Sequence, residues 1–370
     1  MLALVIASAG TSGTLSPWVS VAMLFGGLVL LLVSAHYLVD LATWIAHRLG
    51  VSQLTIGLTI IAFGTSAPEL ALNVVAAISS DAGAELAFGN VVGSNIANIG
   101  LVLGFACLCY GVHANRQVLR VYYPLLVVTE VLLLVIAKVT GEFTRVDGLI
   151  LLLGLPIAVA ILRRWSGGGS SDQEPAEAGS TTRGTASMAG LLLLSIFMLI
   201  AGAKLAETGA VQIARTAGLS EAVIGLTVVA IATSLPESFT AIMAARRGQS
   251  DLVMGTILGS NIFNILSVLA VTSLVRPVPL PHEVGWASLW PMLLFTLAVL
   301  PIYLSRWRDK RATGGSSGHG RLGKVWGGVT FAAWIGCMVF FLFIGQDDTP
   351  ATDDAQMGRS SPPAEAAGGS

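Results

Sequence analysis

The chain has 370 residues, a formal net charge of −1 and a hydrophobic content of 54%. Only 11% of its residues are charged, against about 25% in ordinary soluble domains, and its mean hydropathy is +0.79. This balance argues against a nucleic-acid-binding protein and indicates a membrane protein. Three cysteines, Cys107, Cys109 and Cys337, lie in apolar runs at spacings that make neither a disulfide framework nor a zinc site, and we interpret them as core residues.

Ten apolar runs are long enough to span a bilayer, which needs about 20 residues per helix. They lie at roughly 18–40, 52–78, 86–110, 119–138, 146–164, 187–208, 220–244, 252–274, 284–304 and 324–345. Residues 1–9 are apolar but too short to span. They lack the basic start of a signal peptide, although Ala7-Ser8-Ala9 resembles a cleavage site, so their removal stays open. We expect an all-α polytopic membrane protein.

A linker divides the expected spans into two sets of five. It is rich in Gly and Ser, which is typical of a flexible tether. The predicted parts are a first five-helix repeat, the tether, a second five-helix repeat and a disordered tail, at 1–165, 166–186, 187–345 and 346–370. Because each set has an odd number of spans, the second repeat is inverted relative to the first.

Basic residues predict the orientation, because short cytoplasmic loops gather Lys and Arg. The loops after the odd-numbered spans hold 14 of the 20 Lys and Arg residues, and the opposite side holds five. Six of the 14 lie in the single loop 305–324. We expect a protein of the plasma (inner) membrane, with both termini outside, in the periplasm, and the tether in the cytoplasm.

One unusual segment occurs twice. Residues 57–69 read GLTIIAFGTSAPE and residues 225–237 read GLTVVAIATSLPE, 168 positions apart. A second signature follows each copy, GSNIANI at 93–99 and GSNIFNI at 259–265. Ionisable residues inside apolar spans are rare and indicate function. Two copies of one such unit predict a single central site built from two halves, as in transporters made of repeats.

Helical spacing places the polar residues of each copy on one face. In the first copy this face holds Ala62, Thr65, Ser66 and Glu69, and Ser94 shares a face with Asn98. In the second copy it holds Ala230, Thr233, Ser234 and Glu237, and Ser260 shares a face with Asn264. Pro68 and Pro236 lack the backbone N–H that would bond the carbonyl four residues earlier. The carbonyls near Gly64–Thr65 and Ala232–Thr233 therefore lack their helical hydrogen bonds. Such carbonyls are tolerated inside a membrane where they can bind another partner, such as an ion.

The candidate ligands are all oxygen atoms, which suit hard cations. Two carboxylates offset the charge of a divalent ion, and calcium accepts flexible sets of about six to eight oxygens, whereas magnesium requires tight octahedra. Neither motif contains His or Cys, which argues against zinc, copper and iron. The pattern favours calcium at Glu69 and Glu237, with smaller oxygen clusters around the same carboxylates for sodium.

The duplicated segments resemble the two α-repeats of the sodium/calcium exchangers, within the calcium:cation antiporter superfamily, over residues 57–100 and 225–266. This resemblance implies a calcium antiporter that works by alternating access, and not an enzyme. It also implies residue roles. Calcium ligands map to Glu69, Glu237 and the backbone carbonyls of Thr65 and Thr233. Sodium ligands map to Ala62, Ser66, Ser94, Asn98, Ala230, Ser234 and Ser260. The residues expected to line the same cavity are Asn264, Pro68 and Pro236.

Several points stay open at this stage. Asn264 stands where several family members have aspartate, so the ion stoichiometry and any potassium dependence are undecided. We expect no cofactor besides the transported ions, and the tether is too short for a regulatory calcium-binding domain. Proton/calcium exchange through the same two glutamates is the alternative to sodium/calcium exchange; a channel and an intramembrane hydrolase are disfavoured. Glu130, which lies mid-span outside both motifs, has either a structural role or a role in proton or ion binding.

Overall fold

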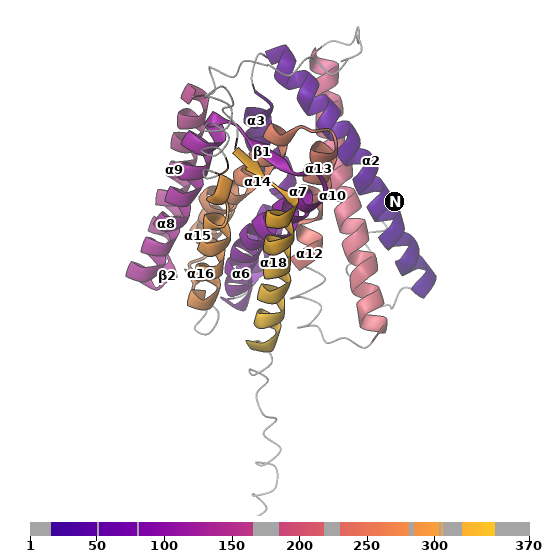
Figure 1. Ribbon diagram of the computed structural model, residues 1–370. Coiled ribbons are helices and arrows are strands. Elements are labelled where there is room, and N and C mark those ends of the chain that lie inside the picture. The colour runs from indigo at the N-terminus through magenta and orange to yellow at the C-terminus, as the bar shows by residue number, and fades with distance from the viewer. Residues whose placement is uncertain are drawn as a thin grey trace, which may run out of the picture.

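The computed structural model describes residues 16–49, 52–79, 81–165, 185–217, 230–280, 285–302, 305 and 320–344. The first half contains α2 (Pro17–Leu49), α3 (Gln53–Ile56), η1 (Gly57–Ile61), α4 (Ala62–Thr65), α5 (Ala67–Ser79), α6 (Asp81–Ala97), η2 (Asn98–Leu103), α7 (Gly104–Tyr110), β1 (Val112–Ala114), η3 (Val118–Tyr122), α8 (Tyr123–Thr140), β2 (Glu142–Phe143) and α9 (Arg145–Trp165). The second half contains α10 (Thr185–Thr216), α12 (Ala230–Thr233), α13 (Leu235–Arg246), α14 (Ser250–Phe263), η5 (Asn264–Leu269), α15 (Ala270–Val275), β3 (Val278–Pro279), α16 (Gly285–Leu297), β4 (Gly320–Leu322) and α18 (Lys324–Ile344). Segments named η are π-helical, and the helices form one bundle (Figure 1).

Eight helical stretches in the described residues are long and apolar enough to cross a membrane. The expected spans at 220–244 and 284–304 are not among them, because both lie partly outside the described residues. The polytopic all-α class is therefore confirmed, whereas the count of ten stays a prediction. Residues 1–9, the tail and most of the predicted tether also lie outside the described residues, and α10 begins inside the predicted tether, at Thr185.

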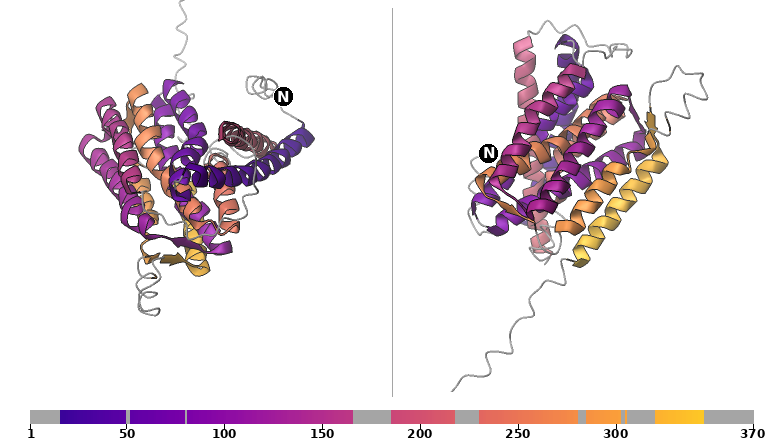
Figure 2. Two further views of the ribbon diagram at one scale, coloured as in Figure 1. Left: turned by 90° about the horizontal axis from the view of Figure 1, so that it is seen from above. Right: turned by 90° about the vertical axis from the view of Figure 1, so that its left-hand side faces the viewer.

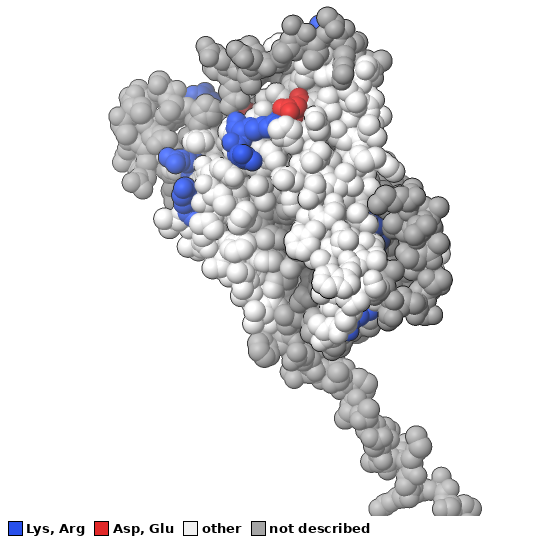
Figure 3. Space-filling view, turned by 90° about the vertical axis from the view of Figure 1, so that its right-hand side faces the viewer, with Lys and Arg blue, Asp and Glu red and all other residues white. Residues whose placement is uncertain are grey.

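The outer surface of the bundle is apolar. Trp18 and Val325 each expose 83% of their surface, and many other large aliphatic and aromatic side chains also point outward. Figure 3 shows one face on which most of the described surface is white, with only a few Lys, Arg, Asp and Glu side chains. An apolar surface of this extent is unusual on a soluble monomer but suits contact with lipid. With the eight spans, it makes this an integral membrane protein.

α2 and α10 pack against each other along their length at one side of the bundle (Figures 1 and 2). Glycines allow the close crossing. A Cβ atom at Gly27 would lie 2.4 Å from the backbone nitrogen of Ala206, and one at Gly209 would lie 2.5 Å from the backbone nitrogen of Leu24. Within lipid, such small-residue crossings let helices associate by van der Waals contact between their backbones.

The two halves make equivalent contacts with each other. α9 of the first half packs against α15 of the second, and α18 of the second half packs against α7 of the first. Two short antiparallel strand pairs also join the halves. β1 pairs with β4, with Val112 opposite Leu322, and β2 pairs with β3, with Phe143 opposite Val278. In the interior, α14 packs against η1 and α4, while α5 packs against η5. The interior is therefore an interface between the halves, to which both contribute.

α14 lies directly against the first of the duplicated segments. A Cβ atom at Gly255 would lie 2.5 Å from the carbonyl oxygen of Leu54, and one at Gly259 would lie 2.7 Å from the Cα atom of Leu58. Contacts of this kind between backbones need glycine, because any side chain would overlap the neighbouring helix. These two glycines therefore determine how closely the halves approach beside the two motifs.

Replacing Gly255 with leucine should prevent correct packing, because the new side chain would overlap the backbone of Leu54. We expect most of the monodisperse protein to be lost when it is extracted in mild detergent and examined by size-exclusion chromatography. Gly336→Leu is the matched control, since Gly336 is exposed on α18 and no described atom lies within 4 Å of a Cβ placed there. Wild-type yield and profile for Gly255→Leu would contradict the close packing of α14.

Candidate functional site

Two helices are interrupted at equivalent positions. Ser66 separates α4 from α5 with φ −89° and ψ 3°. Ser234 separates α12 from α13 with φ −89° and ψ 4°. Pro68 and Pro236 account for these interruptions, because neither can donate to the carbonyl four residues earlier and each ring crowds that turn. Each interruption places a glutamate in the first turn of the helix that follows, where the helix dipole favours negative charge.

Glu69 and Glu237, one from each half, are buried next to each other. Their exposed fractions are 3% and 2%, and their carboxyl groups are close enough to interact electrostatically. Ser66 Oγ donates to Glu237 Oε1 at 3.2 Å, so the first half directly contacts the glutamate of the second. The hydroxyls of Thr65 and Ser260 approach the same carboxyl group without the geometry of a full hydrogen bond. Among the described residues, no basic side chain forms a salt bridge with either glutamate.

Several buried oxygen atoms in the two motifs have no hydrogen-bond partner among the described residues. They are Glu69 Oε2, Glu237 Oε2, Ser234 Oγ, Ser260 Oγ, Asn98 Oδ1 and Asn264 Oδ1. Leaving a buried polar atom without a partner costs about 1–3 kcal/mol, and more when the group is charged. Oxygen atoms from two carboxylates, two hydroxyls and two amides also form the kind of donor set that a hard cation binds. We call these residues, with Ser66, the carboxylate site.

Four asparagines form an amide network between the halves. Asn95 Nδ2 donates to the carbonyl of Asn261 at 3.3 Å, and Asn261 Nδ2 donates to the carbonyl of Asn95 at 3.2 Å. Asn98 Nδ2 donates to Asn261 Oδ1 at 2.9 Å, and Asn264 Nδ2 donates to Asn95 Oδ1 at 3.1 Å. The NH2 groups of Asn98 and Asn264 are held in this way, whereas their Oδ1 atoms have no partner among the described residues.

Asn95 and Asn261 had no predicted role, although both belong to the duplicated GSN signature. The duplication, at an offset of 166 residues, was the one signal that could have pointed to them. Helical spacing from Glu69 could not reveal the role of these two asparagines, because the partners of their side chains lie on the other half of the chain. Asn98 and Asn264 also begin the π-helical segments η2 and η5, a local distortion that is frequent at functional sites.

The remaining predicted residues lie on the helices that flank the breaks or, in the case of Ser94, on α6. Ala62 is fully buried, and its carbonyl accepts from the Ser66 backbone at 3.0 Å and from Thr65 Oγ1 at 3.3 Å. Ser94 is 5% exposed, one residue before Asn95 of the amide network. The other four are placed by their helices: Thr233 ends α12, Ala230 begins it, Pro236 is buried in the first turn of α13, and Pro68 is half-buried in the first turn of α5.

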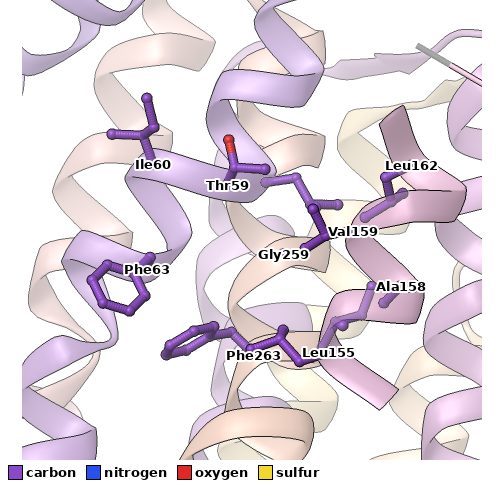
Figure 4. Close-up of a pocket in the computed structure, with 11 residues that line it drawn as sticks. Thr59, Ile60, Phe63, Leu155, Ala158, Val159, Leu162, Gly259 and Phe263 are labelled. Atoms are coloured by element: carbon purple, nitrogen blue, oxygen red, sulfur yellow. The ribbon is translucent and has the colours of Figure 1, made fainter. Parts of the chain in front are cut away.

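A cavity of about 370 Å³ lies beside the first motif, between η1, α9 and α14 (Figure 4). Its lining is apolar apart from Thr59, whose hydroxyl already donates to the carbonyl of Thr55 at 2.7 Å. Phe63 and Phe263 meet edge to face at its border, with ring centroids 5.1 Å apart. Neither Glu69 nor Glu237 contributes to this lining, so the cavity is separate from the carboxylate site.

A helical membrane protein made of two equivalent halves, with a polar site where the halves meet, has the construction of a repeat-built secondary transporter. The family model described as sodium/calcium exchanger protein matches residues 19–163 and 187–343. The chain therefore belongs to the sodium/calcium exchanger family, whose members are transporters and not enzymes. The family that the duplicated motifs predicted is confirmed.

Individual relatives agree with this assignment. The chain is 30% identical over 325 residues to the sodium/calcium exchanger MaX1 of Methanosarcina acetivorans, which covers 78% of this chain and 92% of that relative. It is 34% identical over 264 residues to the inner membrane protein YrbG of Escherichia coli K12, which covers 69% of this chain and 80% of that relative. A solved structure of the sodium-calcium exchanger NCX_Mj, soaked with sodium and strontium, matches with a TM-score of 0.70 and 26% identity over 87% of this chain and 98% of that one.

Proposed function

We propose that this antiporter exchanges calcium for sodium across the plasma (inner) membrane by alternating access, with calcium leaving the cytoplasm as sodium enters. The observation that carries the proposal is the carboxylate site, in which one glutamate from each half is buried next to the other and has an oxygen without a partner among the described residues. Two such carboxylates offset the charge of one calcium ion. The names of the relative MaX1 and of the solved exchanger support sodium and calcium as the two exchanged ions.

The proposed ligands follow the two motifs. Calcium binds to the carboxylates of Glu69 and Glu237 and to the backbone carbonyls of Thr65 and Thr233. Sodium binds to smaller sets of oxygens around the same glutamates, from Ala62, Ser66, Ser94, Asn98, Ala230, Ser234 and Ser260. Asn264, Pro68 and Pro236 line the path of the ions. Both ions compete for the glutamates, and this competition couples their movements, because two ionised carboxylates without a cation are costly inside the membrane.

The test is uptake of radiolabelled calcium into proteoliposomes that contain the purified protein. Sodium, potassium and proton gradients are imposed one at a time, with the membrane potential clamped. The proposal expects uptake driven by an outward sodium gradient, and little response to potassium or proton gradients. Uptake that ignores the sodium gradient would contradict it.

Proton/calcium exchange is the second candidate. The two buried glutamates also favour this candidate, because protons can neutralise two adjacent carboxyl groups just as a metal ion can. In the same assay, this candidate expects calcium uptake to follow the proton gradient and to persist without sodium. The two candidates therefore give opposite results with one preparation of protein.

We also propose the division into two five-helix repeats, at 1–165 and 187–345, with the second inverted relative to the first. The equivalent contacts between the halves support it. We place both termini outside, in the periplasm, and the tether in the cytoplasm, because Lys and Arg gather in the loops on the tether side. The name of the Escherichia coli relative supports an inner-membrane location.

A cysteine-accessibility tag tests this orientation. A tag inserted near Gly168 should be protected from an impermeant reagent in intact cells, whereas a tag after Gly345 should react. Permeabilised cells are the control, because both tags should then react equally. The reverse pattern in intact cells would overturn the orientation and the loop-charge argument behind it.

A further inference from the structure

Glu130 is a further buried carboxyl group, and it lies outside the carboxylate site. It sits near the middle of the span Val118–Thr140 and is 0% exposed. Thr296 Oγ1, from α16, donates to Glu130 Oε1 at 2.7 Å, whereas Glu130 Oε2 has no partner among the described residues. Glu130 belongs to the first half and Thr296 to the second, so the pair joins the two halves.

No charged side chain on the described elements packed around Glu130 compensates its carboxyl group. The elements packed against α8 are η3, α14, η5, α16 and β2. Apart from Glu130, the titratable or charged side chains of these elements and of α8 are Arg120, Tyr122, Tyr123, Lys138, Glu142 and Asp251. Arg120, Lys138 and Glu142 are exposed. Tyr123 donates its hydroxyl to the carbonyl of Thr296, and Asp251 accepts from Asn115. Among the described residues, no salt bridge reaches Glu130.

The neutral acid suits these surroundings better than the carboxylate. A carboxylate at mid-membrane with a single hydroxyl donor is costly, because most of its lost hydration is not replaced. When Glu130 carries a proton, its O–H can donate to Thr296 Oγ1, whose own hydroxyl can turn to the carbonyl of Met292, as Thr side chains often do in helices. The Thr296 hydroxyl thus has two orientations, one for each protonation state of Glu130.

α16 connects this pair to the amide network. Asn95 Nδ2 lies 3.9 Å from Met292 Sδ and donates to it. Met292 is four residues before Thr296, so both side chains lie on one face of α16, one turn apart. Asn95 in turn holds the NH2 group of Asn264. One turn of α16 therefore connects Thr296, which contacts Glu130, to Met292, which contacts the amide network.

We propose that Glu130 is a proton-binding site separate from the carboxylate site, and that its protonation state controls cation binding through Thr296, α16 and the amide network. The inference depends on the proposed function in one respect, since calcium exchange is the activity that it modulates. A proton fits better than a metal ion, because one carboxyl and one hydroxyl supply too few oxygens for sodium or calcium.

The first test compares sodium-driven calcium uptake by wild type and E130Q from acidic to alkaline pH. Glutamine keeps the shape of the acid and does not titrate. We expect E130Q to transport calcium, to lose a pH-dependent change of about fivefold or more in apparent calcium affinity, and to behave at alkaline pH as wild type does at acidic pH. T296V removes the hydroxyl that donates to the carboxylate, so the protonated acid is favoured. T296V should therefore behave like E130Q over a wider range of pH than wild type does. A wild-type pH profile in E130Q would overturn the inference.

T129V is the matched control for the loss of a hydroxyl. Thr129 is buried on the same helix beside Glu130, but its hydroxyl donates to the carbonyl of Leu125 at 2.8 Å and not to a carboxyl group. T129V should keep the wild-type pH profile. If T129V changed the profile as much as T296V, a general effect of packing in α8 would replace the assigned role of Thr296, and the inference would fail.

A second measurement needs neither transport nor a folded E130Q. Infrared difference spectra of the E69Q/E237Q double variant should contain a pH-responsive signal from a protonated carboxyl group shielded from water, distinct from the signals of exposed acids, because Glu130 remains and is 0% exposed. Absence of that signal, or a response to sodium in place of pH, would overturn the inference. Wild-type protein that exchanges no calcium would contradict the proposed function instead, and the infrared result would stand independently of it.

Discussion

Calcium transport is expected to be abolished when either Glu69 or Glu237 is replaced by glutamine, while the protein remains folded in the membrane. Each carboxylate supplies half of the charge that offsets a calcium ion. Removing one partner from a buried charged interaction costs about 3–5 kcal/mol. At about 1.4 kcal/mol per factor of ten, calcium affinity should fall at least about a hundredfold. Radiolabelled calcium uptake under a sodium gradient measures the loss.

The folded state should survive because glutamine has nearly the same size, and because at position 237 its carbonyl can still accept from Ser66. Size-exclusion chromatography in detergent checks this point. Glu85→Gln is the matched control, since Glu85 is exposed on α6 and the same change there should leave uptake unaltered. Retention of most wild-type uptake by either single variant would remove that glutamate from the site.

Replacing Asn261 with alanine should lower transport by about 10- to 100-fold, the usual effect of removing a residue that orients ligands. Asn261 is not one of the proposed ligands. Its Oδ1 accepts from Asn98 Nδ2, and its Nδ2 donates to the carbonyl of Asn95. Without it, the Asn98 amide can rotate, and Asn98 Oδ1 is no longer held in place. Sodium-driven calcium uptake, with its dependence on sodium concentration, is the measurement.

A double-mutant cycle separates this mechanism from general loss of stability. If Asn261 acts through Asn98, then Asn261→Ala and Asn98→Ala should be strongly non-additive. Asn264 is held by Asn95 and not by Asn261, so Asn261→Ala and Asn264→Ala should come closer to additivity. Equal coupling in both cycles would show that the amide network has no such division of roles.

Features that depend on short stretches of chain could be predicted from the sequence. The interruptions at Ser66 and Ser234 follow from the prolines two residues later, and their nearly equal dihedral angles follow from nearly equal local sequences. The burial of Glu69 and Glu237 follows from their place in apolar spans. The duplication also predicted that the two halves meet at one site, because neither copy alone supplies enough charge for a divalent cation.

The partners of each polar group could not be predicted in this way. Asn98 was a predicted ligand, but what holds its amide is Asn261, 163 residues later in the chain. Glu130 lay outside both motifs with two possible roles, and the sequence could not show that Thr296 of the other half donates to it. In both cases the partner belongs to the other half, and a helical period relates only residues within one helix.

Composition, prolines and short-range periodicity act locally, so they were enough to predict the class of protein, the two repeats, the broken helices and the glutamates. Which oxygens lack a partner among the described residues depends on the folded arrangement, because amides and hydroxyls face each other across the interface between the halves. Asn95 and Asn261 show the difference: they hold the NH2 groups of Asn264 and Asn98, and leave the oxygens of those two residues available. The physical reason is that a hydrogen bond depends on distance and direction in space, and separation along the chain specifies neither.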